Sequence, residues 1–246
     1  MREGALEGTW ARARSRARSW RAGLAVLGAA AGWLALLVPG ASAQVEARAL
    51  QVLPANVPVP AAMASACASP SRPACQSASL SAINRARALE GVRPLRLPAT
   101  WARMPMAGQL LVLADLERTD RGLPGFPGLS VALDRKAAAG AAHLTDPIGP
   151  RGVSWGANIA VGYPTALEAD YAWMYDDGPG SANTSCTPSD QSGCWGHRRN
   201  ILGDYGARPS MGAAVSRGRA GLAMTQLFVG RPTGSLAFRL PALGRS

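Results

Sequence analysis

Apolar side chains recur at helical spacing through the middle of the chain. They predict helices over about residues 79–90, 106–121 and 130–143, and from residue 166 onward. In the first two, apolar residues return every three or four positions, and Gly91 and Gly122 follow the last turn as helix-ending residues. The third is rich in alanine and is interrupted by Gly140. Before the fourth, Thr165 and Glu168 stand in the spacing of a capping box.

Two apolar segments near the end of the chain, residues 211–215 and 222–229, predict strands that are joined by a turn of glycine and arginine. A short helix is expected to begin near His197. Helices come first and strands concentrate late, a pattern that favours the α+β class over a wound parallel sheet. We therefore expect one globular domain over residues 106–230.

The first 43 residues have the features of a secretory signal peptide. Six arginines lie among residues 2–21, an apolar run covers residues 23–38, and Ala41-Ser42-Ala43 supplies the small residues of a cleavage site. We expect cleavage after Ala43 and secretion to the extracellular side. The alternative is that the apolar run persists as a membrane anchor, since its length is near the lower limit for spanning.

The segments on either side of the expected domain are poorer in periodic apolar residues. Residues 44–105 are rich in Ala, Pro and Ser and are expected to form a linker that carries one disulfide loop and one helix. Residues 231–246 contain Pro and Gly and are expected to form a loosely held tail.

The chain is strongly basic, with a formal net charge of +11. Removal of the signal peptide, which carries six arginines and two glutamates, leaves about +7. This charge is spread without a Lys/Arg block or interleaved aromatic residues, which argues against a nucleic-acid partner. An anionic polymer or a membrane headgroup surface remains a partner that the charge allows.

The four cysteines fall into two couples, and in each couple the cysteines are eight residues apart. Four cysteines allow three pairings, and in an oxidising compartment we expect Cys67–Cys75 and Cys186–Cys194. A zinc site is the rival interpretation, and the absence of a Cys-x-x-Cys spacing disfavours it.

Two short motifs resemble a known family. Gly156-Ala157-Asn158-Ile159-Ala160 and Gly196-His197-Arg198-Arg199-Asn200-Ile201-Leu202 resemble the Gly-Glu-Asn-Ile-Ala and Gly-His-Arg-x-Asn-Ile-Leu motifs of the CAP superfamily, which includes cysteine-rich secretory proteins, antigen 5, pathogenesis-related class 1 proteins and bacterial extracellular domains. The resemblance implies a three-layer α-β-α sandwich with a central antiparallel sheet and a groove between the motifs. Ala157 stands where the family has glutamate.

Members of this family often line the groove with two histidines and two acidic residues, which sometimes hold a divalent cation. The resemblance places His197 in the groove and suggests His143 as the second histidine and Asp176, three residues after Trp173, as an acidic member. Each has a simpler alternative: a backbone-bonded imidazole at a helix start, an exposed histidine at a helix end, and a turn residue, respectively. Because a methyl group at Ala157 cannot bind metal, we expect no required cofactor and at most weak zinc or calcium binding through His197 and His143.

Aromatic residues cluster around both motifs. Trp155 and Trp195 flank the motif glycines and, with Asn158, are candidates for the groove wall. An apolar groove with few polar groups is the usual form of a small-ligand site.

Three functions fit these patterns. The first is a secreted, non-enzymatic domain that binds a lipid, sterol, glycan or wall component in its groove. The second is a metal-assisted hydrolase or protease that uses His197 with Asp176. No Gly-x-Ser-x-Gly context supports a serine nucleophile, so we lean away from an enzyme. The third is an extracellular interaction domain with a vestigial groove.

Overall fold

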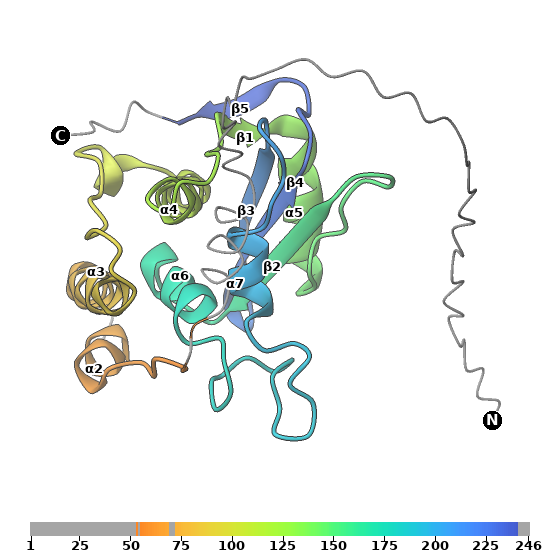
Figure 1. Ribbon diagram of the computed structural model, residues 1–246. Coiled ribbons are helices and arrows are strands. Elements are labelled where there is room, and N and C mark those ends of the chain that lie inside the picture. The colour runs from red at the N-terminus through yellow and green to blue at the C-terminus, as the bar shows by residue number, and fades with distance from the viewer. Residues whose placement is uncertain (1–52, 54, 69–71, 241–246) are drawn as a thin grey trace, which may run out of the picture. The chain divides into compact units, whose positions relative to one another are not determined.

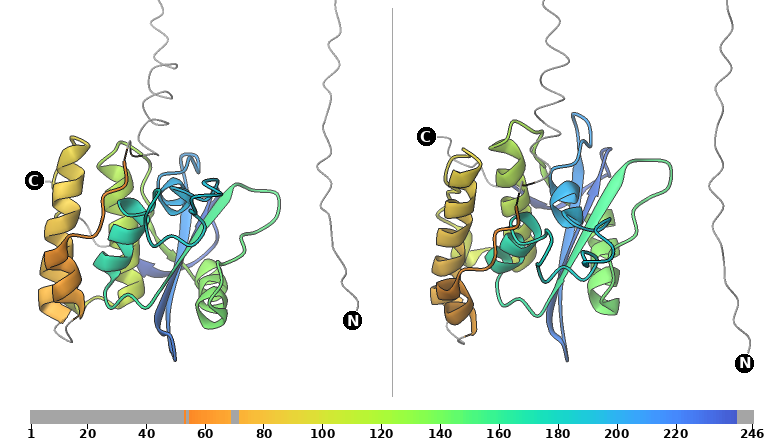
Figure 2. Two further views of the ribbon diagram at one scale, coloured as in Figure 1. Left: turned by 90° about the horizontal axis from the view of Figure 1, so that it is seen from below. Right: turned by 60° about the horizontal axis from the view of Figure 1, so that its bottom comes forward.

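In the part of the chain that the structure describes, five strands form one mixed sheet with helices on both faces (Figures 1 and 2). The computed structural model describes residues 53, 55–68 and 72–240, which belong to a unit that spans Pro39–Ser246. The strands are β1 Gly128–Ser130, β2 Trp155–Val161, β3 Ser210–Gly218, β4 Gly221–Val229 and β5 Leu236–Arg239. The helices are α2 Ala61–Ala68, α3 Arg72–Leu89, α4 Met106–Thr119, α5 Val131–His143, α6 Ala166–Met174 and α7 Gly196–Ile201, with a 3-10 turn at Trp101–Arg103.

The sheet has the strand order β2-β4-β3-β1-β5. β4 pairs antiparallel with both β2 and β3, so that Leu227 lies between Ala157 and Gly212. β1 is parallel to β3 and antiparallel to β5, and the sheet is therefore mixed, not antiparallel throughout as the resemblance implies. Residues 222–229 of β4 are all buried, because strands flank it on both sides and helices cover both faces.

Helix α5 packs on one face of the sheet against β3 and β4, and α4 and α6 lie on the other side (Figure 2). The α+β class is thereby confirmed, as are both predicted strands and the predicted helices. The N-cap role of Thr165 is also confirmed, since its side chain accepts a hydrogen bond from the Glu168 amide, while the Glu168 carboxylate lies beside Cys75 Sγ and does not complete the capping box. Helix α5 runs unbroken through Gly140, where a Cβ would lie 2.8 Å from the Thr145 carbonyl oxygen, so glycine there permits a close backbone approach.

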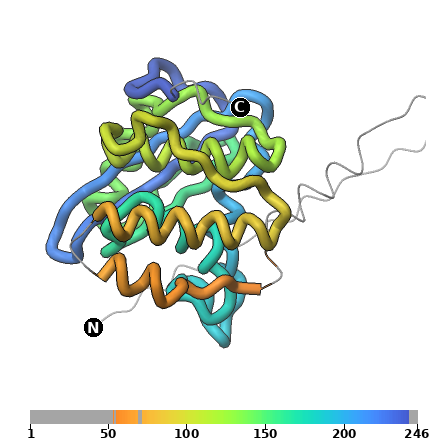
Figure 3. Tube along the Cα trace, turned by 90° about the vertical axis from the view of Figure 1, so that its left-hand side faces the viewer, coloured from red at the N-terminus to blue at the C-terminus, as the bar shows by residue number. Residues whose placement is uncertain are grey.

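The described part of residues 44–105 is not a simple linker. It contains two helices that lie side by side, α2 and α3 (Figure 3), and α3 packs against α6. Helix α3 begins at Arg72, earlier than predicted, because Pro73 is well suited to the first turn and the small residues that follow carry little apolar signal. Met63 and Ile83 are buried in the main core.

The C-terminal segment that was predicted to be a loosely held tail contains a strand. Residues 236–239 of the predicted tail form β5, which pairs with β1. The predicted signal peptide, residues 1–43, lies outside the described residues, as do residues 241–246. Within the described ranges, none of the helices has the length and apolar character that crossing a bilayer requires.

Both expected disulfides are present. Cys67–Cys75 joins the end of α2 to the first turn of α3, and Cys186–Cys194 closes a loop that precedes α7. Each joins cysteines whose Cα atoms are 4.4 Å apart.

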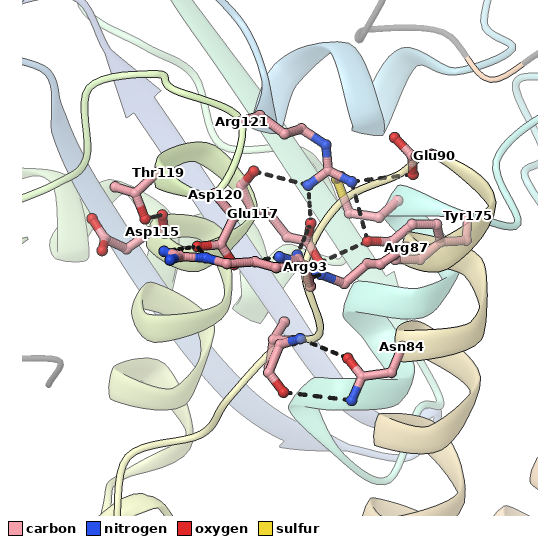
Figure 4. A network of polar contacts seen from close by, with 12 residues as sticks. Asn84, Arg87, Glu90, Arg93, Asp115, Glu117, Thr119, Asp120, Arg121 and Tyr175 are labelled. Atoms are coloured by element: carbon pink, nitrogen blue, oxygen red, sulfur yellow. Dashed lines mark hydrogen bonds and ion pairs between the residues drawn. The ribbon is translucent and has the colours of Figure 1, made fainter. Parts of the chain in front are cut away.

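A buried network of charged groups joins α3 to α4 (Figure 4). The Glu117 carboxylate pairs with Arg87, at 2.6 Å, and with Arg121, and it accepts a hydrogen bond of 2.8 Å from the Tyr175 hydroxyl. Burial opposes the ionisation of Glu117, but Arg121 and Arg87 outweigh that effect and lower its pKa. Glu90 extends the network, because it binds Arg121 at 3.1 Å and Arg198 of α7 at 2.5 Å. The network thus holds α3 and α4 together and connects them to α7, the helix of the second motif.

Candidate functional site

A pocket of about 630 Å³ opens beside β2, where the two motifs come together. Its apolar wall comes from β2, α6 and neighbouring loops: Leu144, Ile159, Ala160, Val161, Tyr163, Ala172 and Trp173. Its polar side chains are Asp146, Glu168, Asp176, Asp177, Asn183, Thr184, Ser185 and His197. The pocket therefore joins an apolar surface to a group of acidic residues.

The His197 imidazole is held by Asp177. Nδ1 of His197 lies 2.6 Å from Asp177 Oδ1, and the backbone amides of His197 and Arg198 donate to Oδ2 at 3.0 and 3.3 Å. Asn183 Nδ2 donates to Oδ1 at 2.7 Å. Because a carboxylate oxygen that already receives an amide hydrogen bond acts as an acceptor, Nδ1–H of the ring is the donor in this contact.

Asp176, the acidic residue expected in the groove, lines the pocket, but its neighbour Asp177 is the carboxylate that binds His197. Asp176 itself accepts a hydrogen bond of 2.5 Å from Asn56. Helix α6 ends at Met174 and Tyr175 leaves the helical conformation (φ −128°, ψ −27°), and this turn decides which of the two aspartates meets the imidazole. The Asp176-Asp177 pair was visible in the sequence, but nothing in the spacing distinguished its two members.

Three of the acidic residues of the pocket, Asp146, Glu168 and Asp176, resist ionisation. Burial raises the pKa of Glu168 to about 7. Burial also raises the pKa of Asp176, where the neighbouring Asp177 adds to the effect and Asn56 opposes it. Burial raises the pKa of Asp146 against the opposing effect of His197. Since no lysine or arginine is among the described residues that line the pocket, it disfavours anionic groups and favours neutral or cationic ones.

Asn158 has a supporting role in the structure. Its buried side chain donates to the His197 carbonyl at 3.2 Å and to Gln226 Oε1 at 3.3 Å. Asn200 Nδ2 donates in turn to Asn158 Oδ1 at 3.0 Å and to the Ala157 carbonyl at 2.7 Å. These amides join β2 to α7 and position His197 without lining the pocket.

The two tryptophans that were expected in the groove wall lie elsewhere. Trp195 is buried and packs on Gly178, where a Cβ would overlap the indole ring. It begins α7 with φ at +62°, a left-handed conformation that lets its amide bond the Asp177 carbonyl at 2.9 Å. Trp155 is 44% exposed and packs on Gly149. The pocket is lined instead by Trp173, which is otherwise buried in the main core.

His143 and Ala157 also lie outside the pocket lining. His143 is exposed at the end of α5. Ala157 belongs to a small core cluster with Leu133, Leu227 and Val229, on the α5 face of the sheet. Its methyl group therefore faces away from the site that the resemblance assigned to it.

The pocket residues do not fit a tight metal site. Within the described ranges, His197 and the pocket carboxylates form no group of three ligand atoms close enough to share an ion; the only such group is Cys67, Cys75 and Glu168. Structural zinc sites use four protein ligands and catalytic sites three. The expected weak binding through His197 and His143 thus finds no support in their geometry.

The His197–Asp177 pair has the orientation of a general base and its supporting carboxylate. A hydrolase with such a base also requires a nucleophile within hydrogen-bond reach of the imidazole. Among the residues that the structure describes, no serine or threonine hydroxyl is hydrogen-bonded to His197.

Comparison of the chain with protein-family models, with curated proteins and with solved structures gives no match.

Proposed function

We propose that the protein is a secreted, non-enzymatic domain of the CAP type that binds a small, neutral or cationic ligand with an apolar portion in the pocket beside His197. The observation that carries this proposal is the composition of the pocket, in which an apolar wall faces four acidic side chains. A volume of about 630 Å³ lies within the usual range for small-molecule sites.

The charge of the pocket narrows the ligand classes that the sequence allowed. A neutral lipid, a sterol or an amine-bearing wall component is compatible with carboxyl groups whose ionisation burial already opposes. A fatty acid would place a second carboxylate among them and is disfavoured. We therefore propose uncharged or cationic ligands.

The proposed family rests on the contact between its two motifs. Gly156 packs beside Asn200, so that a Cβ there would lie 2.7 Å from Asn200 Oδ1. Asn158 and Asn200 then connect the same two segments through their amides. A three-layer α-β-α arrangement is consistent with helices on both faces of the sheet, and we propose it as the CAP fold on this basis.

Equilibrium binding of a radiolabelled sterol, of a diacylglycerol and of oleate tests the ligand class. We expect the sterol or the diacylglycerol to bind and oleate to bind more weakly. Ala172→Trp fills the pocket from α6 and should abolish binding, while Ala142→Trp, at an exposed position of α5, should not. Equal binding by the two variants would show that the ligand site lies elsewhere, on the outer surface that a vestigial groove implies.

A hydrolase is the second candidate, and the His197–Asp177 hydrogen bond is the observation that favours it. Hydrolysis of p-nitrophenyl esters by the purified protein should then fall in both His197→Ala and Asp177→Asn. We expect no hydrolysis above the buffer rate in the unaltered protein, because no hydroxyl among the described residues is bonded to His197.

A further inference from the structure

The Cys67–Cys75 disulfide lies beside one of the carboxyl groups of the pocket. Cys75 Sγ is 3.9 Å from Glu168 Oε2 and 3.8 Å from Thr165 Oγ1. Ser79 Oγ lies 3.6 Å from Cys67 Sγ and 3.9 Å from Cys75 Sγ. The two sulfur atoms and a Glu168 oxygen all lie within 4.8 Å of one another.

We propose that the reduced form of this cysteine pair, together with Glu168, forms a zinc site at the junction of α2, α3 and α6. Two thiolates and a carboxylate are ligands that zinc prefers. With Zn–S near 2.3 Å and Zn–O near 2.0 Å, the ligand atoms of a tetrahedral site are separated by roughly 3.5–3.8 Å. The distance between Cys75 Sγ and Glu168 Oε2 is already close to this value, and a water molecule can complete the shell.

The surroundings of the sulfurs favour thiolates once the disulfide is open. Cys75 lies in the first turn of α3, an 18-residue helix, and the positive end of a helix stabilises a nearby negative charge. The Ser79 and Thr165 hydroxyls are near enough to donate hydrogen bonds to the sulfurs after small rotations. Hydroxyls placed in this way would orient the ligands, as groups around metal sites commonly do.

Glu168 is partly buried and has no ion-pair partner among the described residues. A zinc ion would supply the positive charge that this carboxylate lacks. The second disulfide offers a contrast, because no described acidic or histidine side chain forms a comparable group with Cys186 and Cys194. That pair is therefore a control within the same molecule.

Reduction is the step that creates the ligands. A phosphine reductant such as tris(2-carboxyethyl)phosphine breaks the S–S bond and is oxidised to the phosphine oxide with an oxygen atom from water, whose two protons go to the two sulfurs. A dithiol does the same by becoming a disulfide while its two protons pass to the cysteines. Each cysteine then loses its proton on binding zinc.

Cobalt(II) titration of the full chain, before and after phosphine reduction, tests the proposal through thiolate-to-cobalt charge-transfer absorption. We expect one cobalt per chain in the reduced protein only, and displacement by zinc. The Cys186→Ser/Cys194→Ser variant should behave like the unaltered protein, while Cys67→Ser/Cys75→Ser should lose the absorption. Glu168→Gln should weaken binding at least about tenfold, since even the loss of a supporting contact costs that much in metal affinity.

Binding by an unfolded cysteine pair would not depend on Glu168, so the Glu168→Gln variant separates the folded site from adventitious thiol binding. Zinc should also protect Cys67 and Cys75 from iodoacetamide in the reduced protein, as measured by peptide mass, and circular dichroism should show the folded spectrum. The proposal is overturned if Glu168→Gln binds cobalt as tightly as the unaltered protein, or if the Cys67/Cys75 variant keeps the charge-transfer band. It also fails if reduced, folded protein binds no cobalt. None of these readouts depends on an organic ligand in the pocket.

Discussion

Asp177 accepts hydrogen bonds from both the ring and the backbone amide of His197. One buried carboxylate therefore sets the orientation of the imidazole and caps the first turn of α7. The orientation of the His197 ring in the pocket therefore depends on the same carboxylate that stabilises the start of α7.

Asp177→Asn should destabilise the protein by about 1–3 kcal/mol, because an amide NH₂ would replace an acceptor among four donors. Chemical denaturation measures the loss. The tautomer of His197 should also shift away from Nδ1–H, which ¹⁵N NMR of the imidazole detects. Asp176→Asn is the matched control and should cost less, and a larger loss from Asp176→Asn would contradict the assignment of Asp177 as the supporting residue.

Glu117→Gln should lower the free energy of unfolding by about 3–5 kcal/mol, because it leaves the buried Arg87 and Arg121 without their shared carboxylate. Arg93→Ala provides the comparison. The Arg93 side chain is 61% exposed and pairs with Asp120 at the edge of the network, so its loss should change stability by less than about 1 kcal/mol. Similar losses from both substitutions would show that burial of the charged groups does not increase their contribution to stability.

Glu168 should make the protein less stable as the pH rises. Its pKa is raised from 4.5 to about 7 in the folded state, so the folded protein holds this proton more tightly than the unfolded chain does. The stabilisation is complete below pH 4.5 and is lost as the pH rises through about 7. The buried Asp170, whose pKa is raised mainly by burial and then by Glu117, adds a change of the same sign.

Denaturation curves of Glu168→Gln and the unaltered protein, recorded between pH 4.5 and pH 8, isolate the contribution of Glu168. The difference in unfolding free energy between them should shift in favour of the glutamine variant across this range. A pH-independent difference would mean that Glu168 titrates normally in the folded protein.

Gly178→Ala should be strongly destabilising, by about 1–3 kcal/mol, because the new methyl group would overlap the Trp195 indole in a packed interior. Gly196→Ala should be tolerated, since a Cβ at that position meets no atom within 4 Å. Thermal unfolding of the two variants measures the contrast. If Gly196→Ala were the more damaging change, the motif glycine would have a role that packing does not explain.

The periodic core elements could be predicted from the sequence, while the short and distant pairings could not. α4 and β4 carry long apolar patterns, and Thr165 carries a local capping signal. β1 has only three residues, and it is a strand because it pairs with β3 and β5, which lie far along the chain. β5 alternates between half-buried and exposed residues, so its apolar signal is weak.

The candidate site was predicted in part. His197 and Asp176 do line the pocket, and both proposed disulfides form. The role of Asp177 depends on how the chain turns after α6, and the place of Trp195 depends on a left-handed residue. Tertiary contacts decide such backbone conformations, and no local pattern indicates them.

The hydrogen bonds of Asn158 and Asn200 hold α7 to β2, and none of them involves residues 187–192 of the disulfide loop. Asp177 and the loop residues that line the pocket, Thr184 and Ser185, precede this segment, so the imidazole keeps its anchor points when the segment changes. Residues 187–192 are thus an insertion site: an epitope or a sensor domain could be grafted there while the geometry around His197 is preserved.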